Sequence, residues 1–412
     1  MDDPRSTLTD FDPDAPLPGM PDPWAYMPTP TERPGPPWAM AEMIAAEPGL
    51  ADRIADRVRA DGSAEALASL LRAAAAEGSP VVATGCGTSE HAAMATAAVL
   101  RDAWRAAGLP GRGPVAAQAF ELALDPPAGG VVIGISHEGG TTATMAAMAA
   151  GRTGGASVAL ITGSAASPAA AGSDVTLATV EMDRGWCHTV GYLSPIVAAS
   201  VVGSALAGTS PGAGALGARV RQGIESAHAA GPDGARPDET IGATIAAATH
   251  LLVIGTGADR ITARELALKV EEAAWVPSAV RDLETFLHGH LPATGPETAV
   301  LLVLSERAGL AARAKRARQA LAAAASLGMR PAAILGADAA AAIPESLTPG
   351  GRIVIPESPD LPPAVASLLG GAGPLQLVTL AVSAARGTNP DLIRREDARY
   401  YRAAELADDP NG

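Results

Sequence analysis

Residues 80–89 read Pro-Val-Val-Ala-Thr-Gly-Cys-Gly-Thr-Ser, and this segment is the clearest indication of the fold class. Its apolar residues are typical of a buried strand, and its glycines are typical of a tight turn. The residues from Glu90 to Ala107 have the pattern of a helix. A buried strand, a glycine-rich turn and a helix make up the repeating unit of doubly wound α/β domains, in which helices cover both faces of a parallel sheet.

The same unit recurs along the chain. An apolar helix is expected over residues 189–206. Further short apolar runs, typical of buried strands, lie at residues 131–136, 157–162, 175–178, 251–254, 300–305 and 332–336.

The pattern of residues 81–87 returns at residues 251–257 (Leu-Leu-Val-Ile-Gly-Thr-Gly), 170 residues later. Two of the later strands also recur, at nearly the same distance. We therefore predict an α/β protein with two tandem doubly wound parallel-sheet domains. The predicted organisation is a Pro-rich tail over residues 1–37, a first domain with N-terminal helices over 38–210, a second domain over 211–386 and a C-terminal tail over 387–412.

Composition excludes several classes of protein. The chain has 412 residues, 30 Lys and Arg against 44 Asp and Glu, and a net charge of −14, which argues against nucleic acid or an anionic membrane as a partner. No apolar run is expected to reach the length of a membrane span. The two cysteines, Cys86 and Cys187, and an acidic N-terminus without a signal-peptide pattern favour a cytoplasmic protein.

Two loops that follow predicted strands are candidates for ligand binding. Gly85-Cys86-Gly87-Thr88-Ser89 offers hydroxyl groups and the N–H groups of a helix start, which suit an anion. The alternative is an ordinary strand–helix turn with a serine cap. The second loop, Ser136-His137-Glu138-Gly139-Gly140-Thr141, follows the next predicted strand and should lie beside the first. Its Glu138 would repel a phosphate but accept hydrogen bonds from sugar hydroxyls or from an ammonium group.

A third candidate site lies on the predicted helix that begins near Arg260. Lys269 and Glu272 are three residues apart and therefore share a helix face. Lysine occurs only twice in the chain, so a lysine on an apolar helix suggests a function; the alternative is a solvated Lys–Glu pair. His288 follows in a His-Gly-His loop. The histidines and cysteines lack zinc-ligand spacing, and we expect neither a metal nor a cofactor.

Together these motifs resemble the double sugar-isomerase (SIS) domain family, which includes the isomerase half of glutamine–fructose-6-phosphate amidotransferase and related sugar-phosphate isomerases and deaminases. The first loop is similar to the family's first phosphosugar loop. The second is similar to its Ile-Ser-Gln-Ser-Gly-Glu-Thr loop, and residues 265–272 to its Ala-Leu-Lys-Leu-Lys-Glu helix. His288 falls at the family's Lys-His-Gly with the interval from Glu272 kept at 16 residues.

The resemblance implies roles for these residues. Glu272 would carry the proton between C1 and C2 of an open-chain sugar through an enediol-type intermediate. Lys269 would lie beside the sugar, and His288 would open the ring from the partner subunit of a homodimer. The phosphate would be held by Cys86, Gly87, Thr88, Ser89, Ser136, His137 and Thr141.

The chain also departs from the family pattern. Glu138 replaces a phosphate-binding serine, and Ala398 stands where the amidotransferases carry a lysine. No glutaminase domain is present, which argues against the amidotransferase reaction. The resemblance therefore implies an aldose–ketose isomerase or an amino-sugar-phosphate deaminase. Alternatives are a deglycase or other C–N lyase acting on a modified sugar, and a non-catalytic sugar-binding regulatory protein.

Overall fold

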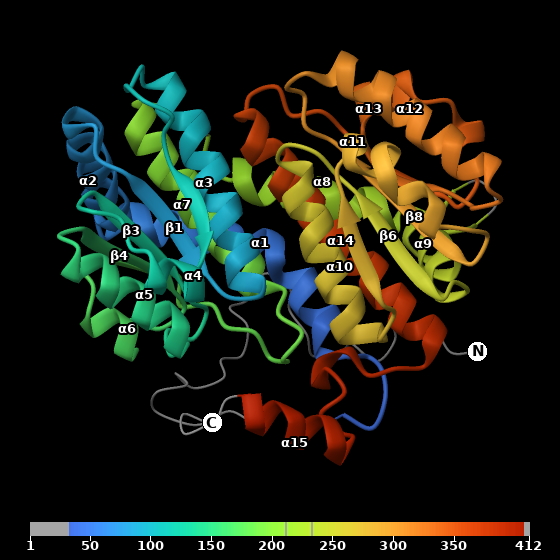
Figure 1. Cartoon of the computed structure of the whole chain (residues 1–412), viewed down its shortest axis with the longest axis horizontal. Helices are drawn as coiled ribbons and strands as arrows, with labels where there is room; N and C mark the ends of the chain where they lie inside the picture. The colour runs from blue at the N-terminus through green and yellow to red at the C-terminus, as the bar shows by residue number, and fades with distance from the viewer. Residues whose placement is uncertain (1–32, 211, 232–233, 408–412) are drawn as a thin grey trace.

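The computed structural model describes residues 33–210, 212–231 and 234–407, so most of the tail predicted over residues 1–37 lies outside the described residues. The described chain contains two five-stranded sheets in which every pairing is parallel. Figure 1 shows the two sheets in separate lobes with helices between them and around them. The predicted class, α/β with two tandem doubly wound domains, is confirmed.

The two sheets have the same topology. The first has the order β2-β1-β3-β4-β5 and the second has the order β10-β9-β8-β6-β7. Numbered from its own first strand, each sheet therefore runs 2-1-3-4-5. The strands are β1 (Val81–Gly85), β2 (Val115–Gln118), β3 (Val131–Ile135), β4 (Ser157–Thr162), β5 (Val175–Ala178), β6 (His250–Ile254), β7 (Ser278–Arg281), β8 (Thr298–Leu304), β9 (Ala332–Gly336) and β10 (Arg352–Ile355).

The apolar runs predicted the six central strands and the edge strand β5, but they predicted none of β2, β7 and β10. All three lie at sheet edges, where one side of the strand has no neighbour in the sheet. Their residues are largely half-buried or exposed. An edge strand needs no continuous apolar run, because only part of its surface meets the core.

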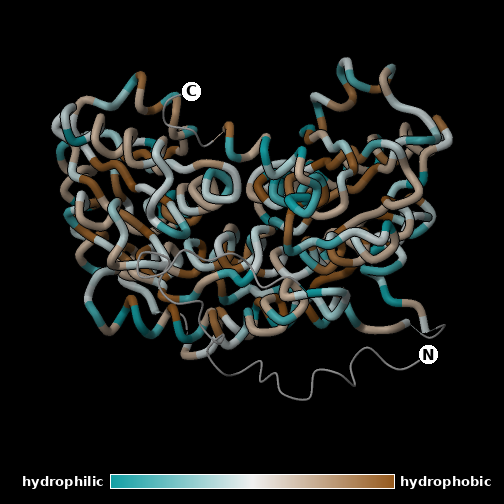
Figure 2. The backbone as a smooth tube through the Cα atoms, turned by 90° about the horizontal axis from the view of Figure 1, so that it is seen from below, coloured by the Kyte–Doolittle hydropathy of each residue, from teal (hydrophilic) through white to brown (hydrophobic). Residues whose placement is uncertain are grey.

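Helices that pack on the inner faces of the two sheets join the sheets into one core. These helices are α1 (Ala39–Ala60), α2 (Ser63–Glu77), α3 (Thr88–Ala106), α7 (Val190–Ala207), α8 (Ala215–His228), α9 (Pro237–Ala246), α10 (Asp259–Ala274) and α14 (Pro363–Arg386). Their buried side chains form a single apolar cluster with Ile133 of the first sheet and Leu301 of the second. Figure 2 shows apolar segments inside both lobes.

The outer face of each sheet has a smaller apolar cluster of its own. The first is covered by α4 (Ala119–Leu124), α5 (Thr142–Thr153) and α6 (Pro168–Ala171). The second is covered by α11 (Leu283–Thr285), α12 (Leu310–Ser326) and α13 (Ala337–Ala342). These helices place the ends of the strands at the edges of the layers, where the predicted site loops begin.

Two core helices correct an expectation from the sequence. By length and composition, α7 and α14 are long and apolar enough to cross a membrane, whereas no such run was expected. Both are mostly buried within the fold, because they pack against neighbouring helices of the shared core. Helix α15 (Ala398–Ala407) differs from them, because none of its residues is buried, and Figure 1 shows it below the two lobes.

Candidate active site

The first predicted loop turns sharply between β1 and α3. A Cβ atom at Gly85 would lie 2.5 Å from the carbonyl oxygen of Ser89, so the turn closes only with glycine there. Gly87 has φ +56°, a conformation that glycine adopts without strain. Thr88 and Ser89 then begin α3, with Thr88 buried and Ser89 half-buried. The Cys86 Sγ atom lies 3.9 Å from the Thr144 hydroxyl of α5, which connects this loop to the helix after the second loop.

The second loop is fixed by its own hydroxyl groups. The Ser136 Oγ atom accepts a hydrogen bond from the Gly139 N–H at 3.1 Å and lies 3.3 Å from the Thr141 hydroxyl. Ser136 and His137 are buried, whereas Glu138 and Thr141 are exposed. The loop leads directly into α5, so a helix start adjoins it as in the first loop. The two loops follow β1 and β3, where the strand order reverses, and such points are the usual ligand sites of doubly wound sheets.

Lys269 and Glu272 form a close ion pair on α10. Lys269 Nζ lies 2.6 Å from Glu272 Oε2 and 3.5 Å from Glu265 Oε1. The Lys269 side chain is 1% exposed and that of Glu272 is 24% exposed, so the carboxylate of Glu272 is the part of the pair that a ligand can reach. The solvated pair that the sequence left open is therefore not what the structure shows.

Burial and neighbouring charges shift the pKa values of Lys269 and Glu272. Burial opposes the charge of Lys269, but the carboxylates of Glu272 and Glu265 outweigh it and raise the pKa of the ammonium group. Burial raises the pKa of Glu272, and Lys269 only partly offsets that effect. At neutral pH the pair thus contains a fixed cation beside a carboxylate whose proton affinity is higher than usual, which suits proton transfer.

A second layer of polar residues holds Lys269 in place. Glu265 is fully buried, and its Oε2 atom lies 2.7 Å from His91 Nδ1 of α3. Burial raises the pKa of Glu265, but Lys269 and His91 outweigh this and lower it. The chain His91–Glu265–Lys269–Glu272 therefore crosses from the first domain to the second through side chains. The sequence did not single out His91 or Glu265, because they are 174 residues apart.

The segment before α7 connects this pair to the second loop, and the sequence analysis assigned it no role. Asp183 accepts hydrogen bonds from the N–H groups of Thr189, Val190 and Gly191 and so caps α7. Its own N–H donates to His137 Nε2 at 3.0 Å. The predicted phosphate ligand His137 is therefore held inward by Asp183. An acidic residue a few positions before an apolar helix was the available signal.

Cys187 and His188 complete the connection. The ring centroids of His137 and His188 are 5.0 Å apart, and the nearby Cys187 thiol lowers the pKa of Glu272, which burial raises. Burial raises the pKa of the Cys187 thiol well above its usual value, so it stays protonated. Burial also lowers the pKa of His188 to about 4, so its imidazole is neutral at physiological pH. The second loop and the Lys269–Glu272 pair thus belong to one continuous polar cluster.

His288 lies apart from this cluster within the chain. It is on an irregular turn, its side chain is 72% exposed, and its Nε2 atom lies 3.2 Å from Glu284 and 3.1 Å from Arg316. Both partners belong to the second domain. The predicted meeting of His288 with Glu272 therefore does not occur inside one chain, and a role for His288 at the site requires a second subunit.

The C-terminal segment packs against the same region. The carbonyl of Asp391 accepts from the Trp186 N–H at 2.8 Å, and the Thr388 hydroxyl donates to the Ala273 carbonyl at 2.7 Å. Trp186 precedes Cys187, and Ala273 follows Glu272.

Among the described residues, no group of three or more His, Cys, Asp or Glu side chains is arranged to hold a metal ion.

Two like-ordered parallel sheets, with strand-end loops beside a lysine–glutamate pair from the other domain, define the class of tandem SIS-like α/β proteins. Residues 244–344 match the family model of the SIS domain, so the chain contains a SIS domain and has two parallel-sheet domains of SIS-like fold. A search of curated protein sequences gives no match to the chain.

Solved structures show the same architecture over most of the chain. The C-terminal domain of glucosamine-fructose-6-phosphate aminotransferase from Francisella tularensis has a TM-score of 0.71 and 17% identity, with 88% of this chain and 99% of that chain covered. Tagatose-6-phosphate ketose/aldose isomerase from Escherichia coli has a TM-score of 0.66 and 19% identity, covering 86% and 95%. Glucosamine-6-phosphate deaminase from Thermotoga maritima has a TM-score of 0.56 and 18% identity, covering 82% and 96%. At these identities the likeness establishes the fold.

Proposed function

We propose that this chain is an enzyme that isomerises a sugar phosphate, or isomerises and deaminates an amino-sugar phosphate, through an open-chain enediol-type intermediate. The observation that carries the proposal is the buried Lys269 ammonium group 2.6 Å from the partly exposed carboxylate of Glu272. The distant structural similarity to phosphosugar isomerases and to a glucosamine-6-phosphate deaminase supports the same class of reaction.

In this reaction Glu272 is the base. Its carboxylate takes the proton from the carbon next to the carbonyl, which leaves an enediolate. It then returns that proton to the neighbouring carbon, while the hydroxyl proton of the substrate passes from one sugar oxygen to the other. A positioned base contributes about 10²- to 10⁴-fold to such a step. Lys269 stays protonated, so its charge stabilises the negative oxygen that develops on the sugar.

The two loops hold the anionic end of the substrate. Ser89 and Thr88 stand at the start of α3, and Ser136 and Thr141 precede α5, so hydroxyl groups and helix N–H groups from two elements converge there. Glu138 is exposed in the same loop, where its carboxylate is suited to hydrogen-bond a sugar hydroxyl.

The test is turnover of a panel of sugar phosphates and amino-sugar phosphates by the wild type and by Glu272→Gln. We expect the variant to lose about 10²- to 10⁴-fold in kcat on the substrate that the wild type converts. The matched control is Glu271→Gln, one position away on the same helix, where the side chain accepts from the Ser278 N–H. A wild type no faster than Glu272→Gln on every sugar would refute catalysis; thermal stabilisation by a sugar without turnover would then identify a sugar-binding protein.

A second candidate is a C–N lyase or deglycase acting on an amine-bearing sugar, which the carboxylate of Glu138 favours. The product separates the two reactions. Release of ammonia or of an amine without net ketose formation supports the lyase, whereas equilibration of aldose and ketose supports the isomerase.

A further inference from the structure

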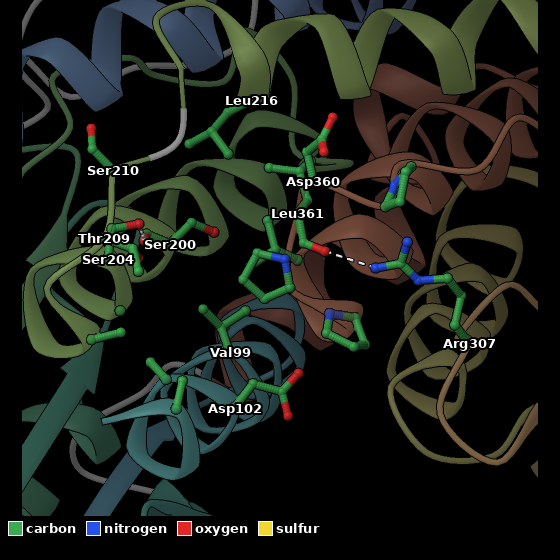
Figure 3. A pocket seen from close by; sticks show the side chains of 18 residues that line it. Val99, Asp102, Ser200, Ser204, Thr209, Ser210, Leu216, Arg307, Asp360 and Leu361 are labelled. Atoms are coloured by element: carbon green, nitrogen blue, oxygen red, sulfur yellow. Dashed lines mark hydrogen bonds between the residues drawn. The ribbon is translucent and has the colours of Figure 1, made fainter. Parts of the chain in front are cut away.

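A cavity of about 520 Å³ lies between the two domains, away from the candidate active site. Figure 3 shows its lining: Val99 and Asp102 from α3, Ser200 and Ser204 from α7, and Asp360 and Leu361 from the segment before α14. Most of the lining is apolar, which is typical of pockets for small organic molecules. No residue assigned above to the candidate active site lines it.

The internal duplication explains why a cavity is found there. Gly85 and Gly255 occupy equivalent turns 170 residues apart, because a Cβ at either would clash with the carbonyl of the residue four positions on, at 2.5 and 2.6 Å. The same distance along the chain relates Asp102 of α3 to Glu272 of α10 and Val99 to Lys269. The cavity therefore lies where the second copy of the duplicated unit would have its own active site.

The segments before the core helices follow the same rule. Cys187 and His188 precede α7 in the candidate active site, and Asp360 and Leu361 precede α14 in the cavity. Both copies thus combine one helix from one domain with a pre-helix segment from the other. A cavity built from the same parts as a substrate site is expected to keep the capacity to bind a small molecule.

The cavity cannot carry out the reaction proposed for the candidate active site, because the two copies differ at key residues. Valine at position 99 removes the ammonium group that Lys269 provides. The anion-binding position of the second copy is also taken, because the fully buried carboxylate of Asp259 accepts from the Ser305 N–H, the Ser305 hydroxyl and the Ser367 hydroxyl at 2.7 to 2.9 Å. The second copy therefore has no phosphate position like that of the first, although Asp259, Ser305 and Ser367 do not themselves line the cavity.

The polar groups at the cavity favour a hydrogen-bond donor. The hydroxyl protons of Ser200 and Ser204 go to backbone carbonyls of α7, so their oxygens are left as acceptors. Asp102 and Asp360 outnumber the single cation Arg307, which donates to the Leu361 carbonyl at 2.8 Å. Asp102 already accepts from the Ala364 N–H and from Arg105, so the exposed Asp360 is the carboxylate available to a ligand. We propose that this cavity is a second ligand site, which binds a small, largely apolar amine.

The test compares three probes of one shape: cyclohexylamine, cyclohexanol and cyclohexanecarboxylate. Binding to the full chain is measured by ligand-observed NMR titration at neutral pH. We expect the amine to bind several-fold more tightly than the alcohol and the carboxylate to bind least. Asp360→Asn should lower the affinity for the amine about three- to tenfold and leave that for the alcohol unchanged. The matched control is Asp125→Asn, an exposed carboxylate that does not line the cavity.

Location is tested by filling the cavity. Ser204→Phe should abolish binding of both the amine and the alcohol, and a cooperative thermal transition establishes that the variant is folded. Should Ser204→Phe not fold, Ser210→Phe at the rim is used in its place. Amine binding that survives the filling variant, an alcohol or carboxylate that binds at least as tightly as the amine, or no binding of any probe would each overturn the proposal. Because no step depends on turnover, this result is independent of the proposed reaction.

Discussion

At the scale of single residues, the candidate site depends on a buried lysine. The chain contains two lysines in 412 residues, and Lys269 is 1% exposed. A buried ammonium group is stable only with carboxylates beside it, and here Glu265 and Glu272 provide them. The sequence indicated Lys269 and Glu272 because three-residue spacing places two side chains on one helix face. It contained no signal for His91 or Glu265, because these two partners are 174 residues apart.

The buried Glu265 carboxylate should contribute far more to the free energy of unfolding than the carboxylate of an exposed ion pair does. Glu265→Gln removes the charge between His91 and Lys269, and we expect it to lower the free energy of unfolding by about 3 to 5 kcal/mol. The control is Glu90→Gln, which breaks the more exposed pair with Arg264 and should cost about 1 kcal/mol or less. Urea unfolding of both variants measures the difference. Equal losses would contradict the assigned role of Glu265.

His188 should make stability depend on pH. Its pKa is about 4 in the folded chain and 6.5 when unfolded, because burial disfavours the charged imidazole. Between these values the unfolded chain binds an extra proton, so the stabilisation is complete above about pH 6.5 and is lost as pH falls toward 4. The loss is at most about 3 kcal/mol. His188→Gln should flatten the stability profile in this window; an unchanged slope would contradict the assignment.

At the scale of elements, the tail that begins at Gly387 stabilises the helix that begins the described core. The carboxylate of Asp391 accepts from the N–H groups of Ala39 and Met40 at 2.8 and 2.9 Å, and so caps α1 from a position 352 residues away. Arg395 stacks on Trp186 and Arg394 on Trp275. Trp186 directly precedes Cys187, and Trp275 lies three residues after Glu272, so the tail contacts the segments that carry the candidate site.

Asp391→Ala should therefore destabilise α1. Loss of a cap costs about 0.5 to 2 kcal/mol, and amide exchange at Ala39 and Met40 should increase more than exchange at the centre of the helix. Asp391→Asn keeps one acceptor oxygen and should lose less. The two are compared by thermal unfolding and by hydrogen exchange, and the cap would be disproved by exchange at Ala39 and Met40 that does not change in either variant.

Most strands that the sequence predicted are more buried than those that it missed, although the largely half-buried edge strand β5 was also predicted. The central strands β1, β3, β8 and β9 are fully buried, so their residues form continuous apolar runs. The edge strands β2, β7 and β10 meet solvent and have mixed compositions. The fold class was predictable because it depends on the buried runs and on their repetition, whereas edge strands depend on pairing across the sheet.

At the scale of the whole molecule, the position of His288 shows that a single chain does not bring this histidine to the candidate active site. It is exposed, and its contacts are Glu284 and Arg316, neither of which belongs to the Lys269–Glu272 cluster. We propose that a homodimer places this histidine at the site of the partner subunit. Sequence alone supplied the residue through its 16-residue interval from Glu272, and a single chain does not place it at the site.

Mixed dimers test this arrangement. Chains with Glu272→Gln and chains with His288→Asn, each carrying a different affinity tag, are co-expressed, and dimers that carry both tags are purified. If sites are completed across subunits, one of the two sites has both wild-type groups, and we expect about half of wild-type activity. Each parent dimer should be nearly inactive. A mixed dimer as inactive as its parents would contradict a shared site.

The apolar cluster that runs without a break from one sheet to the other makes the two repeats dependent on each other. The inner surfaces of both repeats form the walls of one common interior, so neither surface faces water. Cutting the gene between the repeats would give two fragments with large exposed apolar faces. These fragments would stay soluble only if they associate with each other. The residues at the two sites can therefore differ between the copies, but each copy needs the other to cover its apolar inner face.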